Sequence, residues 1–169
     1  MVPSPIFAQG YAAHAHRKQL YGKLPYMTHI GDVVNIVRGV KSVSGHVLEA
    51  AWLHDILEDT NTTKIELGAV FDSFVVDWVW RVTGTGGSRK QRNAAIYSKC
   101  KYYTQPTIIK LADRISNITH AFEHKQKSYI KMYLKEADEF WHGMRDDSMV
   151  DVRPLWDTYE QLIDKVKNG

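Results

Sequence analysis

The segment from His54 to Asp59, with the sequence HDILED, places four ionisable side chains in a stretch that is otherwise built to be buried. The residues before it, 47–53 (VLEAAWL), are mostly apolar and favour a helix. Because a helix turns once every 3.6 residues, Asp55 shares a face with Glu58 and Asp59, and His54 shares one with Glu58. Burying an uncompensated charge costs several kcal/mol, so such groups are normally paired or bound to a metal ion. The segment therefore indicates a site of chemistry.

The apolar residues have helical spacing along nearly the whole chain, which predicts an all-α fold. The runs 74–76 and 78–80 have strand propensity, but the sequence offers them no strand partners, so a helix is favoured there. Residues 20–25 and 83–88 contain glycine and are expected to be loops. Residues 63–66 fit a capping box that starts a short helix. Helices are expected at about 4–17, 29–40, 45–57, 63–71, 73–82, 89–103, 107–122, 127–144 and 154–166.

The chain of 169 residues is expected to form one domain over 1–169, and it contains no repeat or linker that suggests a second domain. Its single cysteine, Cys100, excludes an internal disulfide and fits a reducing compartment. No apolar run is long enough for a membrane span and no signal peptide is apparent, so a cytoplasmic location is expected. The net charge of +3 does not argue for a nucleic-acid partner, but it suits a small anionic substrate.

Four residues are candidate metal ligands: His29, His54, Asp55 and Asp113. Histidine and carboxylate groups are the usual ligands of Mn²⁺, Fe or Zn²⁺ in a site without thiolates. Each residue also has an ordinary structural interpretation. His29 alone would more often be a capping or core histidine, and Asp113 could pair with a basic neighbour at 110 or 114 in the same helix. The combination is a stronger indication than any one member.

Several motifs together resemble one known family. Residues 25–29 (PYMTH) are similar to its PYxxH motif, 50–60 (AAWLHDILEDT) to its LHDxxEDT motif, and 110–117 (KLADRISN) to its KLADRxxN motif. Residues 15–19 (AHRKQ) resemble its first basic motif. These matches identify the chain as similar to HD-domain phosphohydrolases of the RelA/SpoT hydrolase type, and to their stand-alone relatives, the small alarmone hydrolases that include the metazoan SpoT homologue.

The resemblance implies a single-domain HD-type helical bundle of roughly eight to ten helices. The motif-bearing core would span about 11–122, and C-terminal helices would follow over 123–169. It implies one Mn²⁺ ion, with Fe or Zn²⁺ as alternatives, held by the four candidate ligands. The implied reaction is hydrolysis of the 3′-pyrophosphate of (p)ppGpp to GDP or GTP and pyrophosphate. Glu58 and Asp59 match the pair that positions and activates water, while Asn117 and the basic residues near Arg17 match substrate contacts.

Elementary chemistry agrees with these roles. A metal ion lowers the pKa of water and neutralises phosphate oxygens, and Glu58 or Asp59 could accept the proton of the water. The alternative for this pair is a helix-end turn that leads into the cap at Thr63. Pyrophosphate needs cations, and the candidates singled out are Arg17, Lys23 and Arg89, although the last could equally lie on a solvated helix face. Asn117 could contact base or ribose, or be an ordinary surface or core amide.

The chain departs from the family between Gln19 and Pro25, where the family has a longer and more basic segment that helps to hold guanosine. Thr119 and His120 also stand near a position where the family often has arginine. Two alternatives therefore remain beside the alarmone hydrolase: an HD phosphohydrolase acting on another (deoxy)nucleotide, and a silent nucleotide-binding HD module. A guanosine nucleotide is the expected partner, nucleic acid and membrane are not expected, and a homo-oligomer is compatible with the sequence.

Overall fold

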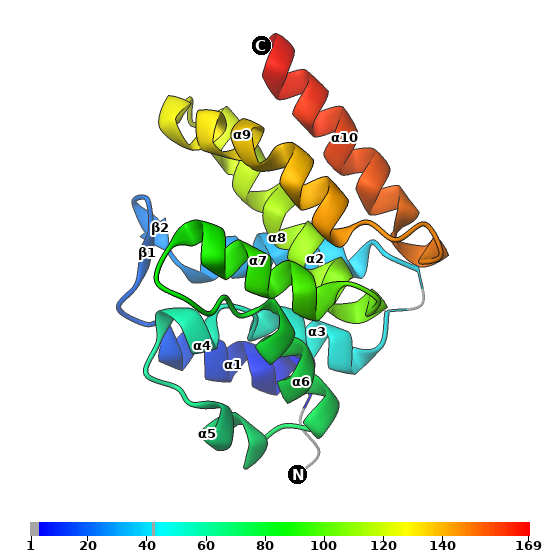
Figure 1. Cartoon of the computed structure of the whole chain (residues 1–169). Helices are drawn as coiled ribbons and strands as arrows, with labels where there is room; N and C mark the ends of the chain where they lie inside the picture. Colours follow the sequence, from blue (N-terminus) through cyan, green and yellow to red (C-terminus); the bar gives the residue numbers. More distant parts are fainter. Residues whose placement is uncertain (1–3, 42) are drawn as a thin grey trace.

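The computed structural model of the protein describes residues 4–41 and 43–169, and this part of the chain is almost entirely helical (Figure 1). The predicted all-α fold is confirmed. Among these residues, no helix has the length and apolar character needed to cross a membrane. The helices are α1 (Pro5–Ala15), α2 (Met27–Arg38), α3 (Gly45–Trp52), α4 (Ile56–Asp59), α5 (Lys64–Gly68), α6 (Ser73–Val82), α7 (Arg89–Cys100), α8 (Thr104–Glu123), α9 (Lys127–Met144) and α10 (Arg153–Asn168), with a short 3₁₀ turn at Val150–Val152.

Helix ends follow the capping residues in the sequence. The capping box predicted at Thr63 is present, because its side chain accepts a hydrogen bond from the Glu66 N–H while the Glu66 carboxylate accepts from the Thr63 N–H. Ser88 and Gln91 form a second capping box at the start of α7. The predicted ranges 73–82 and 127–144 coincide with α6 and α9.

Helix α8 lies at the centre of the molecule and packs against α2, α3, α6, α9 and α10. Its apolar side chains are buried on several sides, which an amphipathic surface helix would not show. The polar residues Asp113, Arg114 and Ser116 are buried in the same helix. Since α8 crosses the middle of the core, these polar groups are placed where they can face residues from α2, α4, α7 and α9. The predicted single domain over 1–169, with a core at about 11–122, stays a prediction.

The prediction of an irregular loop at 20–25 was wrong in one respect. Residues Leu20–Tyr21 (β1) and Leu24–Pro25 (β2) pair as an antiparallel hairpin, with Tyr21 opposite Leu24. Gly22 has φ of 64°, a conformation that glycine adopts at little cost and that a tight hairpin turn requires. Strands of two residues are too short to produce an alternating pattern, so the sequence carried no signal for them.

The predicted continuous helix over 45–57 was also wrong, because α3 ends at Trp52 and residues 53–55 form a turn before α4. In a continuous helix the carbonyl oxygen of Ala51 would accept from the backbone N–H of Asp55. Here it accepts instead from Nδ1 of His54, at 2.8 Å. The side chain of His54 thus takes the place of a helical hydrogen bond, and the chain bends at the most charged point of the motif.

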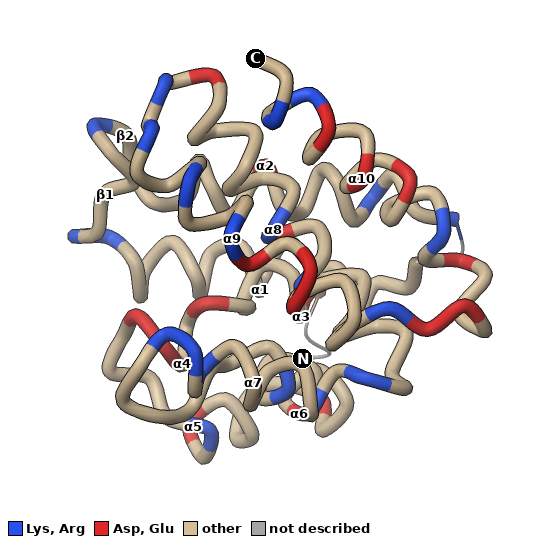
Figure 2. The backbone as a smooth tube through the Cα atoms, turned by 45° about the horizontal axis from the view of Figure 1, so that its top comes forward, with Lys and Arg blue, Asp and Glu red and all other residues tan. Residues whose placement is uncertain are grey.

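Charged residues of both signs are interspersed along the helices (Figure 2). Lys and Arg lie beside Asp and Glu on α9 and α10, in keeping with the small net charge of +3. Because the surface charges are mixed, they do not point to a functional site, and the candidate site is identified below from buried charged residues and their partners.

Candidate metal centre and its cavities

Four side chains from α2, from the 53–55 turn and from α8 converge in the interior. Nε2 of His54 lies 3.0 Å from Oδ2 of Asp55, and Nε2 of His29 lies 3.6 Å from the same oxygen. One potential ligand atom each from His29, His54 and Asp55 all lie within 4.8 Å of one another. Oδ1 of Asp113 is 3.3 Å from Nε2 of His29 and 3.9 Å from Nε2 of His54. The structure therefore brings together all four predicted metal ligands.

The turn at 53–55 explains how two consecutive residues face one point. Neighbouring side chains on a regular helix diverge by about 100°. Leu53 and Asp55 both have ψ close to 0° and φ near −100°, which takes the backbone out of the helical path. His54 and Asp55 can then point into the same space, although sequence spacing on one continuous helix would not have allowed it.

The histidine ring nitrogens are arranged as in a metal site. Nδ1 of His54 donates to the carbonyl of Ala51, which leaves Nε2 as the acceptor nitrogen. Although this buried Nε2 lies 3.0 Å from Oδ2 of Asp55, it makes no hydrogen bond within the described chain. Nδ1 of His29 lies 3.2 Å from the hydroxyl of Ser116. Metal-ligating histidines typically use their second nitrogen for such an outer contact. The residues present therefore fit a bound metal ion.

The ionisable groups of the cluster shift one another's pKa values. Burial lowers the pKa of His29, but hydrogen bonds to Asp113 and Asp55 outweigh it and raise this pKa to about 9. Burial raises the pKa of Asp113, yet the Lys110 ammonium at 2.7 Å and the hydrogen bond to His29 bring it below its usual value. The carboxylates are thus ionised near neutral pH, and a positive partner is required between them. A metal ion and a protonated histidine can each supply that charge.

Glu58 and Asp59 lie in α4, one turn after Asp55. The Glu58 carboxylate accepts a hydrogen bond from the backbone N–H of Gly84, and burial raises its pKa above the usual value, with the Asp55 charge adding to this. Oδ2 of Asp59 accepts from Nε2 of Gln19 at 2.8 Å. Both acids line the same space as Asp55, which is what a pair acting on a water molecule needs.

That space, called the central cavity below, has a volume of about 220 Å³, and its lining includes both acids and cations. The cations come from α7 and α8 and are Arg89, Arg92, Lys110 and Arg114. Arg89 and Arg114 share the carboxylate of Glu136, at 2.6 and 2.7 Å. Arg92 donates only to the carbonyl of Gly87, at 3.3 Å, and has no carboxylate partner within the described residues.

Asn117 connects the central cavity with a second space of about 250 Å³, the hairpin cavity, which β1, α8 and α9 enclose. Its amide donates to the carbonyl and to Oδ1 of Asp113, at 3.1 and 2.5 Å. Its Oδ1 accepts from the hydroxyl of Tyr21 at 2.9 Å. The ring of Tyr21 also stacks on that of His29, with centroids 4.9 Å apart. The short hairpin thus contacts both the candidate metal ligand and the candidate substrate amide.

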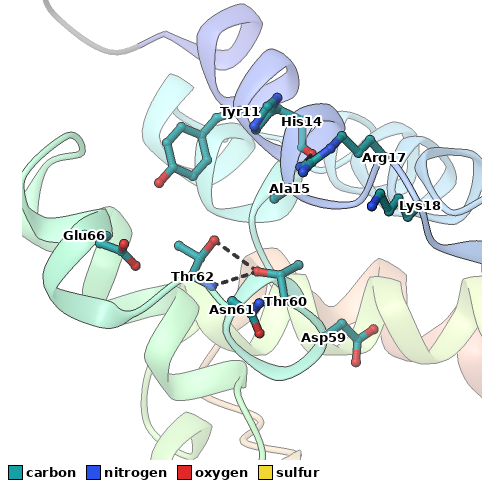
Figure 3. A pocket seen from close by; sticks show the side chains of 10 residues that line it. All are labelled: Tyr11, His14, Ala15, Arg17, Lys18, Asp59, Thr60, Asn61, Thr62 and Glu66. Atoms are coloured by element: carbon teal, nitrogen blue, oxygen red, sulfur yellow. Dashed lines mark hydrogen bonds between the residues drawn. The ribbon is translucent and has the colours of Figure 1, made fainter.

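The remaining predicted substrate residues lie at different places. Arg89 and Asn117 line the central cavity. Arg17 lines a neighbouring cavity that shares Asp59 with the central one (Figure 3). Lys23 is exposed in the hairpin turn. The structure therefore places Arg89 and Asn117 close to the candidate metal ligands, but not Arg17 and Lys23.

Sequence reasoning missed three residues of the site. The hydroxyl of Tyr26 donates to Oδ2 of Asp55 at 2.6 Å, and its place inside the PYxxH motif was a usable signal. Glu136, which pairs with two arginines, and Tyr133, which lines both cavities, lie in α9, outside every motif that was identified. Nothing in the local sequence distinguishes these two from other residues of an amphipathic helix.

Comparison with known proteins gives a consistent result. No family model matches the chain. It is 32% identical over 147 residues to the Danio rerio guanosine-3′,5′-bis(diphosphate) 3′-pyrophosphohydrolase MESH1, covering 80% of this chain and 81% of that protein. It is also 32% identical over 114 residues to the Drosophila melanogaster MESH1 protein. That match covers 64% of each protein, so it spans just under two thirds of the fly protein. This chain belongs to the MESH1 family.

MESH1 membership confirms the predicted relationship to RelA/SpoT-type hydrolases. The fold is also that of two solved structures. One is the structure described as a metazoan orthologue of SpoT that hydrolyses ppGpp, with a TM-score of 0.73, 22% identity, and coverage of 94% of this chain and 98% of that one. The other is lmo0812 of Listeria monocytogenes, with a TM-score of 0.63, 24% identity, and coverage of 86% and 97%. At these identities the two structures establish the fold alone.

Proposed function

We propose that this protein is a metal-dependent pyrophosphohydrolase that removes the 3′-pyrophosphate of (p)ppGpp, giving GDP or GTP and pyrophosphate. The observation that carries the proposal is the convergence of His29, His54, Asp55 and Asp113. The two aspartates of this cluster line a cavity together with Glu58 and several cations. The names of its MESH1 relatives state this activity for those proteins.

His29, His54, Asp55 and Asp113 would hold the metal ion, which when bound would lower the pKa of water and neutralise phosphate oxygens. Mn²⁺ is proposed as the native ion on the strength of the family resemblance, with Fe or Zn²⁺ as alternatives, since a set of imidazole and carboxylate groups suits all three. Tyr26 holds Asp55 through its hydroxyl, and Ala51 fixes the ring of His54. These contacts reduce the freedom of the ligands before any ion binds.

Glu58 and Asp59 would orient the attacking water and accept its proton. The oxygen of that water bonds to the phosphorus next to the ribose while the bond from this phosphorus to the ribose 3′ oxygen breaks. The 3′ oxygen keeps the electron pair of the broken bond and takes up the proton that the pair accepted, which gives the 3′ hydroxyl and free pyrophosphate. The raised pKa of Glu58 suits a group that takes up a proton. Neighbouring carboxylates titrate together, so the base is assigned to the pair.

The cations that line the central cavity would bind the pyrophosphate. Arg92 is best placed for this role, because its guanidinium has no carboxylate partner in the described chain while Arg89, Arg114 and Lys110 do. The ribose and base would extend past Asn117 into the hairpin cavity, where aromatic rings line the wall. The substrate contacts predicted for Arg17 and Lys23 stay predictions, because neither residue lines the central cavity.

From the sequence we also propose a cytoplasmic location, no nucleic-acid partner and a homo-oligomeric assembly. The interspersed charges in Figure 2 agree with a small-molecule partner.

The test is turnover by purified, metal-stripped protein with added Mn²⁺, Fe²⁺ or Zn²⁺, against ppGpp, pppGpp, GTP, dATP and dAMP. Release of pyrophosphate from ppGpp only when metal is added is the expected result. One observation favours a second candidate, hydrolysis of another (deoxy)nucleotide: Tyr21 of the short hairpin already bonds to Asn117. Cleavage of another nucleotide without ppGpp turnover would select that candidate. No turnover of any nucleotide in the panel would overturn both hydrolase candidates and favour a nucleotide-binding module.

A further inference from the structure

A third cavity, larger than the central and hairpin cavities, lies on the other side of Asp59, between the end of α1 and the segment that follows α4 (Figure 3). Its volume is about 590 Å³, and it is called the α1 cavity here. Arg17 and Lys18 stand on its α1 side, and Thr60 and Asn61 face them from the opposite wall. Asp59 lines this cavity and the central cavity alike, so a ligand here would be next to a proposed catalytic carboxylate.

The two cations of the α1 cavity are available to a ligand. Arg17 and Lys18 are exposed, and neither has a carboxylate partner within the described part of the chain. The Arg17 guanidinium donates one hydrogen bond, to the carbonyl of His14 at 2.8 Å, which leaves its other donors unused. A guanidinium of this kind binds phosphate through charge-assisted, forked hydrogen bonds.

The two acids of the same cavity are already engaged. The carboxylate of Glu66 accepts from the backbone N–H and the hydroxyl of Thr63, at 2.7 and 2.9 Å, as part of the capping box of α5. Asp59 accepts from Gln19. These donors are neutral, so both acids keep their charge, but their positions are fixed by these bonds. Arg17 and Lys18 keep unused donors, and an anionic group of a ligand would bind there.

The size and the neutral groups of the wall favour a ligand larger than a phosphate. A cavity of about 590 Å³ is within the range for small-molecule and cofactor sites, roughly 300–1,000 Å³. Tyr11 supplies an aromatic wall, and its ring is held by an edge contact with Phe71, with centroids 5.4 Å apart. The side-chain amide of Asn61 is exposed and makes no hydrogen bond within the described residues. An aromatic ring and an amide are the groups that contact a nucleobase.

The turn that carries the cations also positions Asp59. Nδ1 of His16 lies 2.7 Å from Oε1 of Gln19, and Nε2 of Gln19 donates to Oδ2 of Asp59 at 2.8 Å. Arg17 and Lys18 lie between these two residues in the chain. A ligand that draws this turn toward itself would therefore act on the hydrogen bond that orients Asp59.

We infer that the α1 cavity is a second nucleotide-binding site, which takes the phosphate groups of the nucleotide on Arg17 and Lys18 and is coupled through Gln19 to Asp59. Binding in this cavity stands without the proposed function, while the coupling rests on it through the role of Asp59.

The test is a titration of the full chain followed by ¹⁵N-resolved NMR. The side-chain amide of Asn61 reports on the α1 cavity and that of Asn117 on the central cavity. GDP is expected to shift both signals with two different dissociation constants. Inorganic pyrophosphate should shift Asn61 more weakly, and guanosine should leave it unchanged, because the phosphates supply the charge contact. Pyrophosphate binding as tightly as GDP would overturn the assignment to a nucleotide.

The double variant Arg17→Gln/Lys18→Gln should weaken GDP binding at Asn61 about tenfold or more. The matched control Arg38→Gln/Lys41→Gln removes the same charge from exposed residues outside both cavities, and should leave the Asn61 titration unchanged. An Asn61 signal that GDP does not shift would overturn the proposal. One common dissociation constant for Asn61 and Asn117, at one GDP per chain, would overturn it too and make the cavity an extension of the substrate site.

The coupling between the α1 cavity and Asp59 is tested separately, through its effect on kcat. Added GDP should change kcat of the wild type, whereas competition at the central cavity alone would raise only KM. The Gln19→Ala variant should lose the effect on kcat while its Asn61 signal still responds to GDP. An unchanged kcat in the wild type would overturn the coupling. Failure of the proposed function would appear separately, as absence of ppGpp turnover.

Discussion

At the scale of single residues, the site depends on His54 and Asp55 facing the same point from one turn. Asp55 contacts both histidines and accepts a hydrogen bond from the hydroxyl of Tyr26. Replacing it removes one candidate metal ligand and one of the two carboxylates that both buried histidines contact, leaving only Asp113. A metal ion that lacks a charged ligand is held much less tightly.

Asp55→Ala should therefore abolish metal retention and reduce turnover below detection. Metal content after dialysis, measured by mass spectrometry beside the rate of ppGpp hydrolysis, tests this. Asp164→Ala, an exposed carboxylate on α10, is the matched control and should behave as the wild type does. Full turnover by Asp55→Ala would reject the metal site.

Glu58→Gln should keep the metal but lower kcat by about 10²- to 10⁴-fold, because the amide cannot accept the proton of the water. The pKa of Glu58 is raised by burial, so the wild-type rate should fall, as pH decreases, at a higher pH than an ordinary carboxylate would give. The variant should lose this acid limb from its pH profile. A pH–rate profile of both proteins tests the assignment, and an unchanged rate in the variant would remove Glu58 from the mechanism.

At the scale of elements, the loop 83–88 links the proposed base to a cationic helix. The backbone N–H of Gly84 donates to Glu58, and a Cβ atom at Gly84 would lie 2.8 Å from the Cβ of Arg92. Gly84→Ala should therefore displace Arg92 or the loop and lower kcat/KM about tenfold, since small displacements of catalytic groups are costly. At Gly87 an added Cβ meets only Oε1 of Gln91, at 3.8 Å, so Gly87→Ala is the control. Equal rates for the two variants would contradict the role of the loop.

Helix α9 is joined to α7 and α8 by Glu136, whose carboxylate pairs with Arg89 and Arg114. Arg114 is only 4% exposed, so Glu136→Ala would leave a buried cation without its partner. We expect a loss of about 3 kcal/mol in the free energy of unfolding. Urea denaturation measures it, with the exposed neighbour Asp138→Ala as the control. A loss of less than about 1 kcal/mol, the range of surface pairs, would show that Arg114 finds another partner.

The same scale shows how far sequence reasoning reached. Helix starts that carry their own signal, such as the Thr63 capping box, were predicted correctly because those contacts span a few residues, although α5 ends at Gly68 and not near Phe71 as predicted. The break after Trp52 was not predicted, because residues 53–55 contain neither Gly nor Pro and the bend depends on the bond from His54 to Ala51. The four candidate metal ligands were selected from residue type and family resemblance, and the structure brings them together. Glu136 and Tyr133 were not, because they become part of the site only when α9 packs against α7 and α8.

At the scale of the whole molecule, metal binding, proton binding and folding are linked. The pKa of His29 is about 9 in the metal-free fold, above the ordinary 6.5 of an unfolded chain. Its protonated form therefore stabilises the metal-free protein fully below pH 6.5, and this contribution is lost as pH rises toward 9. A metal ion must displace that proton, so its affinity should increase over the same interval.

Between pH 6.5 and 9, the melting temperature of the metal-free protein should thus fall, while the increase in melting temperature on adding Mn²⁺ should grow. An ion at about 100 times its dissociation constant stabilises the fold by about 2.7 kcal/mol. Calorimetry with and without a chelator, across this pH range, measures both trends. Asp55→Ala should show no response to Mn²⁺ at any pH. If the wild type gained the same stability from Mn²⁺ at both ends of the range, no proton would be released on binding, and His29 would not be a ligand.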